Sequence, residues 1–304
     1  MMFTAMPYNR RSFFRTVSAS ISAALPAMPQ TEHFRKPLGA EIYTVREILS
    51  HNADLTLKQI KEIGYTEVEG NRTDLATIAP ICRKYGLVIP SGHLETGLIT
   101  GKREEWNLPA ALTWEGAVEE AKSYGLEYVV IPYVRPDERG SPDDWREFCD
   151  KLNEAGETAR KAGLPLCYHN HAFEFAGETG QRRIDILLEH TDPNLVHLEV
   201  DVFWVSAAGQ DPVEFLAQNA ARVRLIHLKD KPAGMPVIHD ESEAKPSDFK
   251  EIGNGSLDFR AILRAAEKTG VAHYYVEQDR TPGDPVDSLR VSYRRLRALT
   301  IQGG

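Results

Sequence analysis

From Leu38 onward the sequence alternates between short apolar segments and longer amphipathic stretches, and this alternation restricts the fold more than any other feature. The apolar segments are rich in β-branched and aromatic residues, which is typical of strands, and the stretches between them repeat apolar residues at helical spacing. Strands that alternate with helices form parallel sheets. About eight such units over roughly 250 residues is the size of a closed (β/α)₈ TIM barrel, so we predict a single α/β domain.

The expected strands cover residues 39–45, 66–70, 87–93, 127–134, 166–171, 195–201, 224–230 and 272–278. The expected helices cover 55–64, 75–86, 114–125, 143–163, 182–190, 212–223, 257–270 and 286–299. An open doubly wound sheet is disfavoured because YTVRE, not a Gly-rich phosphate loop, ends the first strand. One long polar stretch, 229–256, follows the seventh strand, where the lid of a barrel active site would lie.

Consecutive strands of the second half end in side chains that bind metal ions. The segments are LCYHNHAFEF (166–175), LEVDVFW (198–204), LIHLKD (225–230) and YYVEQD (274–279). Active sites of barrels form at the C-terminal ends of strands, and neighbouring strands lie about 4.8 Å apart. We therefore expect Asp201, His227 and Glu277 to surround one ion.

The fifth expected strand offers the fourth ligand. His169 and His171 lie on this strand, and Glu174 lies just past its end. A set that mixes carboxylates and imidazoles suits Mn²⁺, Zn²⁺, Co²⁺ or Fe²⁺ better than Ca²⁺, which prefers oxygen ligands. We therefore expect one divalent metal ion as the cofactor.

The N-terminal segment is typical of a twin-arginine export signal. In NRRSFFRTVSASISAALPAMPQ (9–30), Arg10 and Arg11 precede a weakly apolar stretch and the small-residue pattern ALPA. This stretch is too short and too polar for stable insertion into a membrane. We expect residues 1–36 to be a signal peptide and linker, residues 37–304 to form the barrel, and the protein to be periplasmic or extracellular.

The charge of the chain argues against nucleic acid as a partner. The formal net charge is −8, whereas proteins that bind nucleic acids usually present a basic face. The three cysteines have no zinc-type spacing and are odd in number, so no disulfide framework is indicated.

Several motifs give the chain a family resemblance. They are LGAEIYTVRE (38–47), IGYTEVEG (63–70), PSGH (90–93), YHNHAFEF (168–175), LEVDVFWV (198–205), HLKD (227–230), GNGSLDF (253–259) and VEQD (276–279). Together they resemble the xylose isomerase-like TIM barrel superfamily, in particular its sugar phosphate isomerase/epimerase branch, which includes inosose dehydratases and ketose 3-epimerases. This resemblance implies a small carbohydrate as the substrate and the possibility of a homo-oligomer.

The same resemblance implies a ligand set. The superfamily holds its metal with Glu, Asp, His and Glu, which fall by motif on Glu174, Asp201, His227 and Glu277. Many relatives place the first Glu directly before an Asn-His pair, where this chain has His169. The first ligand is therefore either Glu174 or His169, and in the second case Glu174 would contact the substrate.

A divalent cation beside carboxylates and imidazoles suits proton abstraction next to a carbonyl, through an enediolate. Return of the proton gives epimerisation or isomerisation, and loss of a leaving group gives a lyase reaction, so the sequence leaves these outcomes open. We expect isomerase or epimerase activity, with a lyase or dehydratase acting on a keto-sugar or 3-keto-glycoside as the alternative. The expected acid and base residues are His169, His171, Glu174 and Glu277.

Four further side chains are expected to bind the substrate. The resemblance places His93 and Tyr43 near strand tips, Lys229 lies two residues past His227, and Trp204 offers an aromatic face to a sugar. No cluster of Arg and Lys marks a phosphate site, although the backbone amides of Gly253 and Gly255 could bind an anion. A neutral or oxidised sugar is therefore favoured over a sugar phosphate.

Two functions of other classes stay open. An endonuclease-type metal phosphodiesterase would carry more zinc ligands, and Trp204 stands where DNA-repair relatives carry a histidine. A non-catalytic sugar-binding subunit would keep the aromatic side chain but would misplace the acid and base groups.

Overall fold

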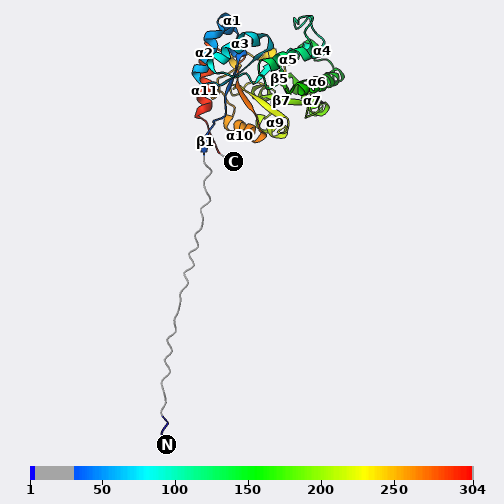
Figure 1. Cartoon of the computed structure of the whole chain (residues 1–304). Coiled ribbons are helices and arrows are strands. Elements are labelled where there is room, and N and C mark those ends of the chain that lie inside the picture. The colour runs from blue at the N-terminus through cyan, green and yellow to red at the C-terminus, as the bar shows by residue number, and fades with distance from the viewer. Residues whose placement is uncertain (4–30, 303–304) are drawn as a thin grey trace.

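The structure is a computed structural model that describes residues 1–3 and 31–302. The expected signal peptide falls almost wholly on residues outside that description. Eight parallel strands close into a barrel in chain order, which confirms the predicted TIM barrel (Figure 1). The strands are β2 (Gly39–Glu41), β3 (Glu67–Asn71), β4 (Ser91–His93), β5 (Tyr128–Ile131), β6 (Leu166–His169), β7 (Val196–Asp201), β8 (Val223–Leu228) and β9 (His273–Val276).

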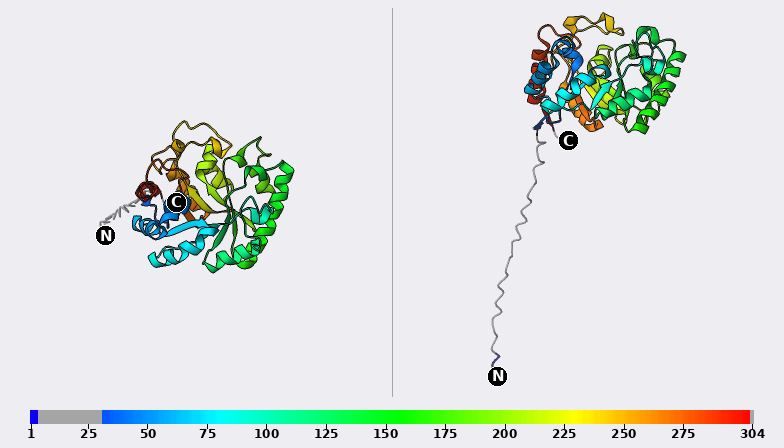
Figure 2. Two further views of the ribbon diagram at one scale, coloured as in Figure 1. Left: turned by 90° about the horizontal axis from the view of Figure 1, so that it is seen from above. Right: turned by 45° about the horizontal axis from the view of Figure 1, so that its top comes forward.

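Helices surround the barrel on its outside, as the view along the barrel in Figure 2 shows. The α-helices are α1 (Arg46–His51), α2 (Ala53–Ile63), α3 (Arg72–Tyr85), α4 (Gly97–Thr100), α5 (Trp114–Ser123), α6 (Pro142–Ala162), α7 (Arg183–His190), α8 (Val202–Ala207), α9 (Pro212–Gln218), α10 (Phe259–Thr269) and α11 (Pro285–Ala298). The 3-10 turns are η1 (Ile42–Val45), η2 (Pro136–Glu138), η3 (Phe173–Phe175), η4 (Glu241–Glu243) and η5 (Pro246–Asp248).

Local sequence signals set the ends of the longer helices. Ser141 caps α6 by accepting a hydrogen bond from Asp144 N–H, and Pro142 occupies the first turn, where a missing N–H costs nothing. The helix ends at Gly163, whose φ of 85° is the left-handed conformation that glycine adopts without strain. Such caps fix where each strand begins and therefore which side chains reach the mouth of the barrel.

The first strand and the sixth barrel strand, β7, both pass into a helical turn as soon as they reach an acidic residue. The predicted strand 39–45 ends at Glu41, whose side chain accepts a hydrogen bond from Tyr43 N–H and starts η1. In the same way Asp201 accepts hydrogen bonds from the N–H groups of Phe203 and Trp204 and starts α8. The segment 42–45 was therefore predicted wrongly as strand, because the side chain-to-backbone bond of Glu41 outweighs its β propensity.

A short antiparallel pair outside the barrel joins the two ends of the described chain. In it, β1 (Thr31–His33) pairs with β10 (Thr300–Gln302). The next residue, Phe34, is fully buried and packs edge-on against Tyr274 of β9. Residues from Thr31 onward thus belong to the folded unit.

The long segment after β8 lies over the mouth of the barrel. Residues 229–256 carry only η4 and η5, as the polar composition predicts, yet Ile238, Phe249 and Ile252 are buried. Phe249 stacks on Phe203 of α8 at a centroid distance of 4.8 Å. The segment is therefore anchored to the barrel by apolar contacts.

Among the described residues, none of the helices combines the length and the apolar character needed to cross a bilayer.

Candidate metal and sugar site

Four potential ligands from four successive strands meet at the C-terminal mouth of the barrel. His169 ends β6, Asp201 ends β7, His227 lies on β8, and Glu277 follows β9 directly. The sheet register pairs Asp201 with His227, so these two lie side by side. Ligand atoms of His169, Asp201 and His227 all lie within 4.8 Å of one another, and all three residues are buried. Glu277 Oε2 lies 2.8 Å from His227 Nδ1 and completes the group.

Each of the two histidines directs its other ring nitrogen to a buried glutamate. His227 Nε2 lies 2.6 Å from Glu69 Oε2, and His169 Nδ1 lies 3.0 Å from Glu199 Oε2. The hydrogen bond from His169 Nδ1 to Glu199 fixes the tautomer and leaves Nε2 as an acceptor, the usual arrangement of a metal-binding histidine. His227 instead lies between two carboxylates, Glu69 at Nε2 and Glu277 at Nδ1; burial alone would lower its pKa, but the nearby carboxylates raise it well above the usual value. Glu69 and Glu199 therefore orient His227 and His169.

His93 lies between these two glutamates. Its Nε2 is 3.4 Å from Glu69 and 3.5 Å from Glu199. Burial alone would lower the pKa of His93, but the carboxylates of Glu69 and Glu41 outweigh it and hold that pKa well above its usual value. For Glu199 the order is the same: burial favours its neutral form, but His227, His169 and His93 hold its pKa well below the usual value. His93 is thus a cationic bridge within this carboxylate layer.

Lys229 occupies the space between the acidic groups of the site. Its Nζ lies 2.8 Å from Asp201 Oδ2, 2.5 Å from Glu277 Oε2 and 2.8 Å from Asp279 Oδ2. Although Lys229 is buried, these three carboxylates raise its pKa well above the usual value. The ammonium group therefore already places positive charge where Asp201 and Glu277 would bind a cation.

Glu174 lies away from the other expected ligands. Its carboxylate accepts hydrogen bonds from the Tyr168 hydroxyl, at 2.8 Å, and from His171 N–H, at 2.9 Å. It is fully buried, and desolvation raises its pKa to about 8. Glu174 does not belong to the group of ligand atoms that lie within 4.8 Å of one another, whereas His169 belongs to it with Asp201 and His227. The geometry thus favours His169 as the first ligand and gives Glu174 contacts that hold the loop of His171.

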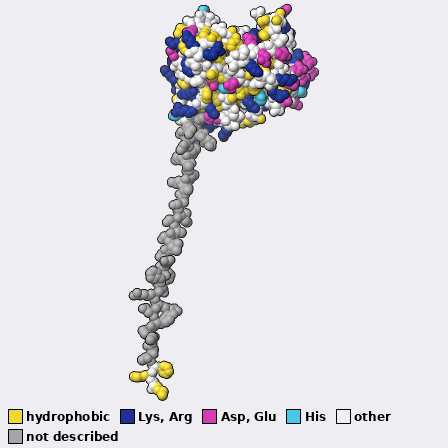
Figure 3. All heavy atoms as spheres, viewed as in Figure 1, with side chains coloured by type: hydrophobic (Ala, Val, Ile, Leu, Met, Phe, Trp, Pro, Cys, Tyr) yellow, Lys and Arg dark blue, Asp and Glu magenta, His cyan; other side chains and the backbone are white. Residues whose placement is uncertain are grey.

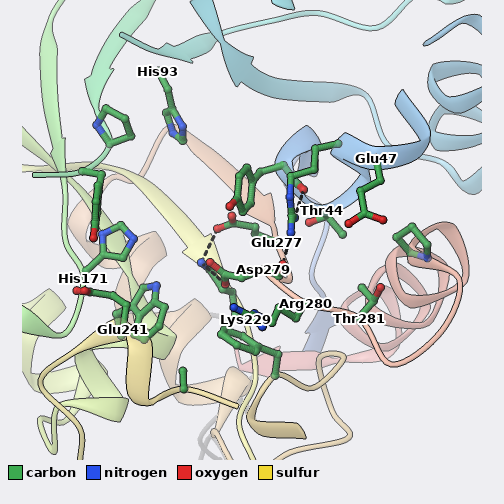
Figure 4. Close-up of a pocket in the computed structure, with 18 of the residues that line it drawn as sticks. Thr44, Glu47, His93, His171, Lys229, Glu241, Glu277, Asp279, Arg280 and Thr281 are labelled. Carbon is green, nitrogen blue, oxygen red and sulfur yellow. Dashed lines mark hydrogen bonds and ion pairs between the residues drawn. The ribbon is translucent and has the colours of Figure 1, made fainter. Parts of the chain in front are cut away.

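A cavity of about 780 Å³ opens above these residues. Of the expected substrate-binding residues, His93, Trp204, Lys229 and Tyr43 all line it. Figure 4 shows Lys229, Glu277 and Asp279 in the middle, His171 and Glu241 on one side, and Glu47 and Thr281 on the other. The cavity thus extends to both sides of the candidate metal site.

His171 stands on the aromatic side of this cavity. Its ring lies 5.4 Å from that of Trp204 and 5.1 Å from that of Tyr133, centroid to centroid. Burial, with the nearby His169 and Lys229, lowers the pKa of His171 well below the usual value. A neutral imidazole that faces a cavity is a suitable proton acceptor. The indole N–H of Trp204 is buried without a partner among the described residues, so the ring edge is free to donate to a bound molecule.

The residues fit a divalent cation by two criteria. The donors are two imidazoles and two carboxylates, a set that suits Mn²⁺, Zn²⁺, Co²⁺ or Fe²⁺. Asp201 Oδ2 is buried and has no hydrogen-bond partner among the described residues, although it forms an ion pair with Lys229. Buried polar atoms without hydrogen bonds are uncommon in folded proteins. A cation held by His169, Asp201, His227 and Glu277 would satisfy that oxygen.

Sequence reasoning treated several residues of this region as ambiguous or left them out. Glu69 and Glu199 lie within predicted strands, but their contacts with His227 and His169 could not be read from the sequence. Asp279 was left out, although it follows Glu277 by two residues and the period-two alternation of a strand would put both on one face. The sequence gives no signal for Glu41, whose Oε2 is buried without a hydrogen-bond partner in the part of the chain that the structure describes.

The expected anion site is absent from the described residues. The N–H groups of Gly253 and Gly255 both donate to Asp230 Oδ2, at 3.0 and 3.1 Å. Those of Ser256 and Leu257 donate to Asp230 Oδ1. The carboxylate of Asp230 thus occupies the position that a phosphate would take, and the GNGS turn serves to hold the loop.

Comparison with known proteins agrees with this geometry. The chain is 30% identical to an inosose dehydratase of Geobacillus kaustophilus (strain HTA426) over 232 residues, which are 70% of each protein. The matched segments of other inosose dehydratases, such as that of Geobacillus thermodenitrificans (strain NG80-2), cover about half of either protein.

Solved structures of the same fold extend the comparison. A sugar phosphate isomerase/epimerase from Parabacteroides distasonis ATCC 8503 is 25% identical, has a TM-score of 0.70 and is matched over 91% of this chain and 97% of its own. The IOLI protein, whose structure holds a zinc atom, is 17% identical with a TM-score of 0.64, over 85% of this chain and 96% of its own, and shares the fold. Residues 57–299 match the family described as xylose isomerase-like TIM barrel, and the chain belongs to that family.

Proposed function

We propose that this protein is a divalent-metal-dependent enzyme that removes a proton next to the carbonyl of a sugar, through an enediolate. The observation that carries the proposal is the cluster of ligand atoms of His169, Asp201 and His227, with Glu277 beside His227, next to a large cavity that His169 and Glu277 line. Membership of a family of sugar enzymes supports the carbohydrate as substrate class.

The four residues would hold one Mn²⁺, Zn²⁺, Co²⁺ or Fe²⁺. When bound, such a cation supplies a Lewis acid that polarises the carbonyl and stabilises the negative charge of the enediolate. Glu69 and Glu199 each contact one ring nitrogen, of His227 and His169 respectively, and so orient the two rings. The buried carboxylates, His93 and Lys229 thus form a charged surface beneath the proposed position of the substrate, which we call the floor of the cavity.

The proton transfers are assigned to groups on the two sides of that floor. His171 is neutral and faces the cavity, so we assign it the role of base. Lys229 lies across the floor in the charged form and is the acid or the partner of a developing oxyanion. Glu277 both faces His227 and lines the cavity, which makes it a second proton carrier. Glu174 supports the backbone at His171 and acts as a positioning residue.

The outcome after proton removal separates an isomerase or epimerase from a lyase. An isomerase or epimerase returns the proton, whereas a lyase expels a leaving group from the neighbouring carbon. Similarity to a solved sugar phosphate isomerase/epimerase supports the first, and similarity to inosose dehydratases supports the second. We retain isomerase or epimerase as the leading assignment and lyase as the alternative.

A neutral keto-sugar is the preferred substrate. The backbone amides that could have held a phosphate already bind Asp230. The proposed export also supports an unphosphorylated sugar.

We infer export by the twin-arginine route from Arg10 and Arg11. A reporter fused to residues 1–36 should leave the cytoplasm, and retention of the reporter despite an active pathway would overturn this inference.

Two functions of other classes have less support. A phosphodiesterase acting on nucleic acid would need a basic surface, but the chain carries a net charge of −8. On the face in Figure 3 the Lys and Arg side chains are interspersed with acidic and apolar ones. A non-catalytic sugar-binding role does not explain why a cluster of potential metal ligands borders the cavity that the neutral imidazole of His171 lines.

Solvent deuterium tests the proposal directly. The purified protein, stripped and reloaded with Mn²⁺, Zn²⁺, Co²⁺ or Fe²⁺, should exchange a carbon-bound hydrogen of a keto-sugar for deuterium in deuterated water. A product with one inverted carbon centre indicates an epimerase, and a product whose carbonyl has moved to the neighbouring carbon indicates an isomerase. An unsaturated product indicates a lyase. Metal-loaded protein that binds keto-sugars without exchange or elimination would move the assignment to a binding subunit.

A further inference from the structure

The cavity is larger than a single sugar requires. Its volume of about 780 Å³ is near the upper end of the range for small-molecule sites, roughly 300–1,000 Å³. A six-carbon sugar would fill only about a quarter of it at the packing density of protein interiors. If one ring lies over the metal site, the space on at least one side of that ring remains to be filled.

One side of the cavity is built from residues that the proposed reaction does not use. The turn η1 and the start of α1 contribute Tyr43, Arg46 and Glu47, and the loop between β9 and α11, beyond Glu277 and Asp279, contributes Arg280 and Thr281. Figure 4 shows Glu47, Arg280 and Thr281 on the side of Glu277 and Asp279 away from His171. This wall, which we call the η1 wall, lies beside the reaction site and does not form part of it.

An aromatic ring on the η1 wall is held ready for contact. Tyr43 is 41% exposed, and the Arg46 guanidinium lies 4.0 Å from the centroid of its ring. Arg46 is fixed in turn, because its Nη1 donates to the carbonyls of Tyr43 and Asp279, at 2.7 and 3.1 Å. A fixed tyrosine in a cavity can pack against the C–H face of a sugar and offer its hydroxyl at the edge.

Two charged groups of opposite sign complete the η1 wall. Glu47 and Arg280 are exposed to the cavity, and neither side chain has a hydrogen-bond or ion-pair partner among the described residues. A carboxylate accepts from two hydroxyls and a guanidinium donates to two oxygens, so together they suit adjacent hydroxyls of a neutral sugar. The carboxylate of Glu47 would repel a phosphate on the same wall.

We propose that the η1 wall is a second sugar subsite, and that the substrate is a keto-disaccharide or longer keto-glycan, not a free monosaccharide. The unit bearing the carbonyl lies over His169, Asp201, His227 and Glu277, and the second unit packs on Tyr43 and bonds to Glu47 and Arg280. This assignment rests on the proposed function, because the carbonyl-bearing unit is placed by the metal site.

The test compares two ketones in four proteins. The ketones are glucose oxidised at one ring carbon and a glucose disaccharide oxidised at the same carbon of one unit. The proteins are wild type, Glu47→Gln, Arg280→Gln and the control Glu62→Gln, whose side chain lies on α2 and pairs with Lys58 outside the cavity. The rate of deuterium exchange or product formation gives kcat/KM, and calorimetry gives the Kd of each ketone.

The disaccharide ketone should have a kcat/KM at least tenfold above that of the monosaccharide ketone in wild type. Glu47→Gln and Arg280→Gln should each lower the value for the disaccharide ketone by about tenfold, the usual loss for a hydrogen bond to a charged group. The monosaccharide ketone should be unaffected, and Glu62→Gln should match wild type with both. This combination supports the second subsite.

Equal kcat/KM for the two ketones, or equal losses for both in the variants, would overturn the subsite while the proposed reaction stands. A phosphorylated monosaccharide ketone serves as a third substrate in the same assay. A loss of kcat/KM in Arg280→Gln that is confined to this substrate would also overturn the subsite, in favour of a phosphate contact. If wild type turns over neither ketone, the proposed reaction is at fault and the calorimetry decides. Weaker binding of the disaccharide ketone in both variants would then support the subsite, and unchanged or absent binding would overturn it.

Discussion

The interior of the barrel holds two polar groups of residues that differ in their hydrogen bonding. In the lower layer Ser91 donates to the Tyr275 hydroxyl at 2.6 Å, and His273 Nδ1 lies 3.0 Å from Glu67 Oε2. The upper layer, which includes the positions two residues further along β3 and β4, contains several polar atoms that are buried without hydrogen-bond partners among the described residues. They belong to Glu41, Glu69, His93, Glu199 and Asp201.

This difference separates a structural cluster from a binding site. Buried polar groups that pair with one another stabilise the interior and need nothing further. Groups left without partners are costly, and a chain retains them where a ligand supplies the missing contacts. Both layers draw on β3 and β4, so secondary structure and burial alone would not tell them apart. The hydrogen-bond pattern distinguishes the two layers, and variants that remove a charged group from one layer or the other test this distinction.

The largest difference is expected between matched acid-to-amide changes in the two layers. Asp201→Asn keeps the oxygen that caps α8 but removes a charge at the metal site, so it should abolish stoichiometric metal binding. Glu67→Gln in the lower layer should leave the metal content at that of wild type. Metal analysis after reconstitution measures both. A full complement of metal in Asp201→Asn would remove Asp201 from the ligand set.

A smaller loss is expected one contact further from the metal. Glu69→Gln retains an acceptor for His227 Nε2 but loses the charge that raises the basicity of that ring. Such partners of metal-binding histidines typically contribute about 10- to 100-fold in affinity. Equilibrium dialysis should therefore show metal affinity at least tenfold below that of wild type. Glu67→Gln, two residues earlier on β3, is the matched control, and equal affinities in the two variants would contradict the assigned role of Glu69.

Replacement of Lys229 is expected to change the affinity in the opposite direction. Its ammonium group contacts Asp201 and Glu277, so a cation must compete with it or share their charge. Lys229→Met should thus bind metal about tenfold more tightly, even though it loses activity. Lys231→Met is the control, because the Nζ of Lys231 donates to the Ser206 carbonyl and has no ion-pair partner among the described residues. Weaker metal binding in Lys229→Met would show that the lysine supports the site and does not compete for it.

The sequence predicted the barrel and its ligand strands, because both depend on local signals. Strand-and-helix alternation is visible in any window, and Asp201, His227 and Glu277 all stand at strand ends. The first ligand stayed ambiguous between His169 and Glu174 because they are five residues apart and a single turn decides which one faces the mouth. That turn is η3, where His171 N–H and the Tyr168 hydroxyl hold Glu174.

Contacts between distant strands were the part that local signals could not give. Glu69 meets His227 across 158 residues of sequence, and His93 reaches both Glu69 and Glu199. The hydrogen bonds from the amides of Gly253 and Gly255 to Asp230 are another such contact, since the sequence shows the GNGS turn but not the carboxylate that binds it. Pairing in three dimensions therefore decided which acidic residues serve the site and which serve the fold.

The smallest effect is expected in the lower layer, as a change in stability with pH. Burial alone would lower the pKa of His273, but the carboxylate of Glu67 outweighs it, so the folded-state pKa is above the usual value of 6.5. The stabilising contribution of this pair is therefore complete below the unfolded pKa and is lost as pH rises through the folded pKa. His273→Gln should cost about 1 kcal/mol of unfolding free energy at pH 6 and less at pH 9, with metal content unchanged. Urea titrations of wild type and variant at the two pH values measure it. A loss of unfolding free energy that grows with pH would mean that His273 is buried in its neutral form. The ion pair with Glu67 would then be absent, and the contrast between the lower layer and the metal site would fail.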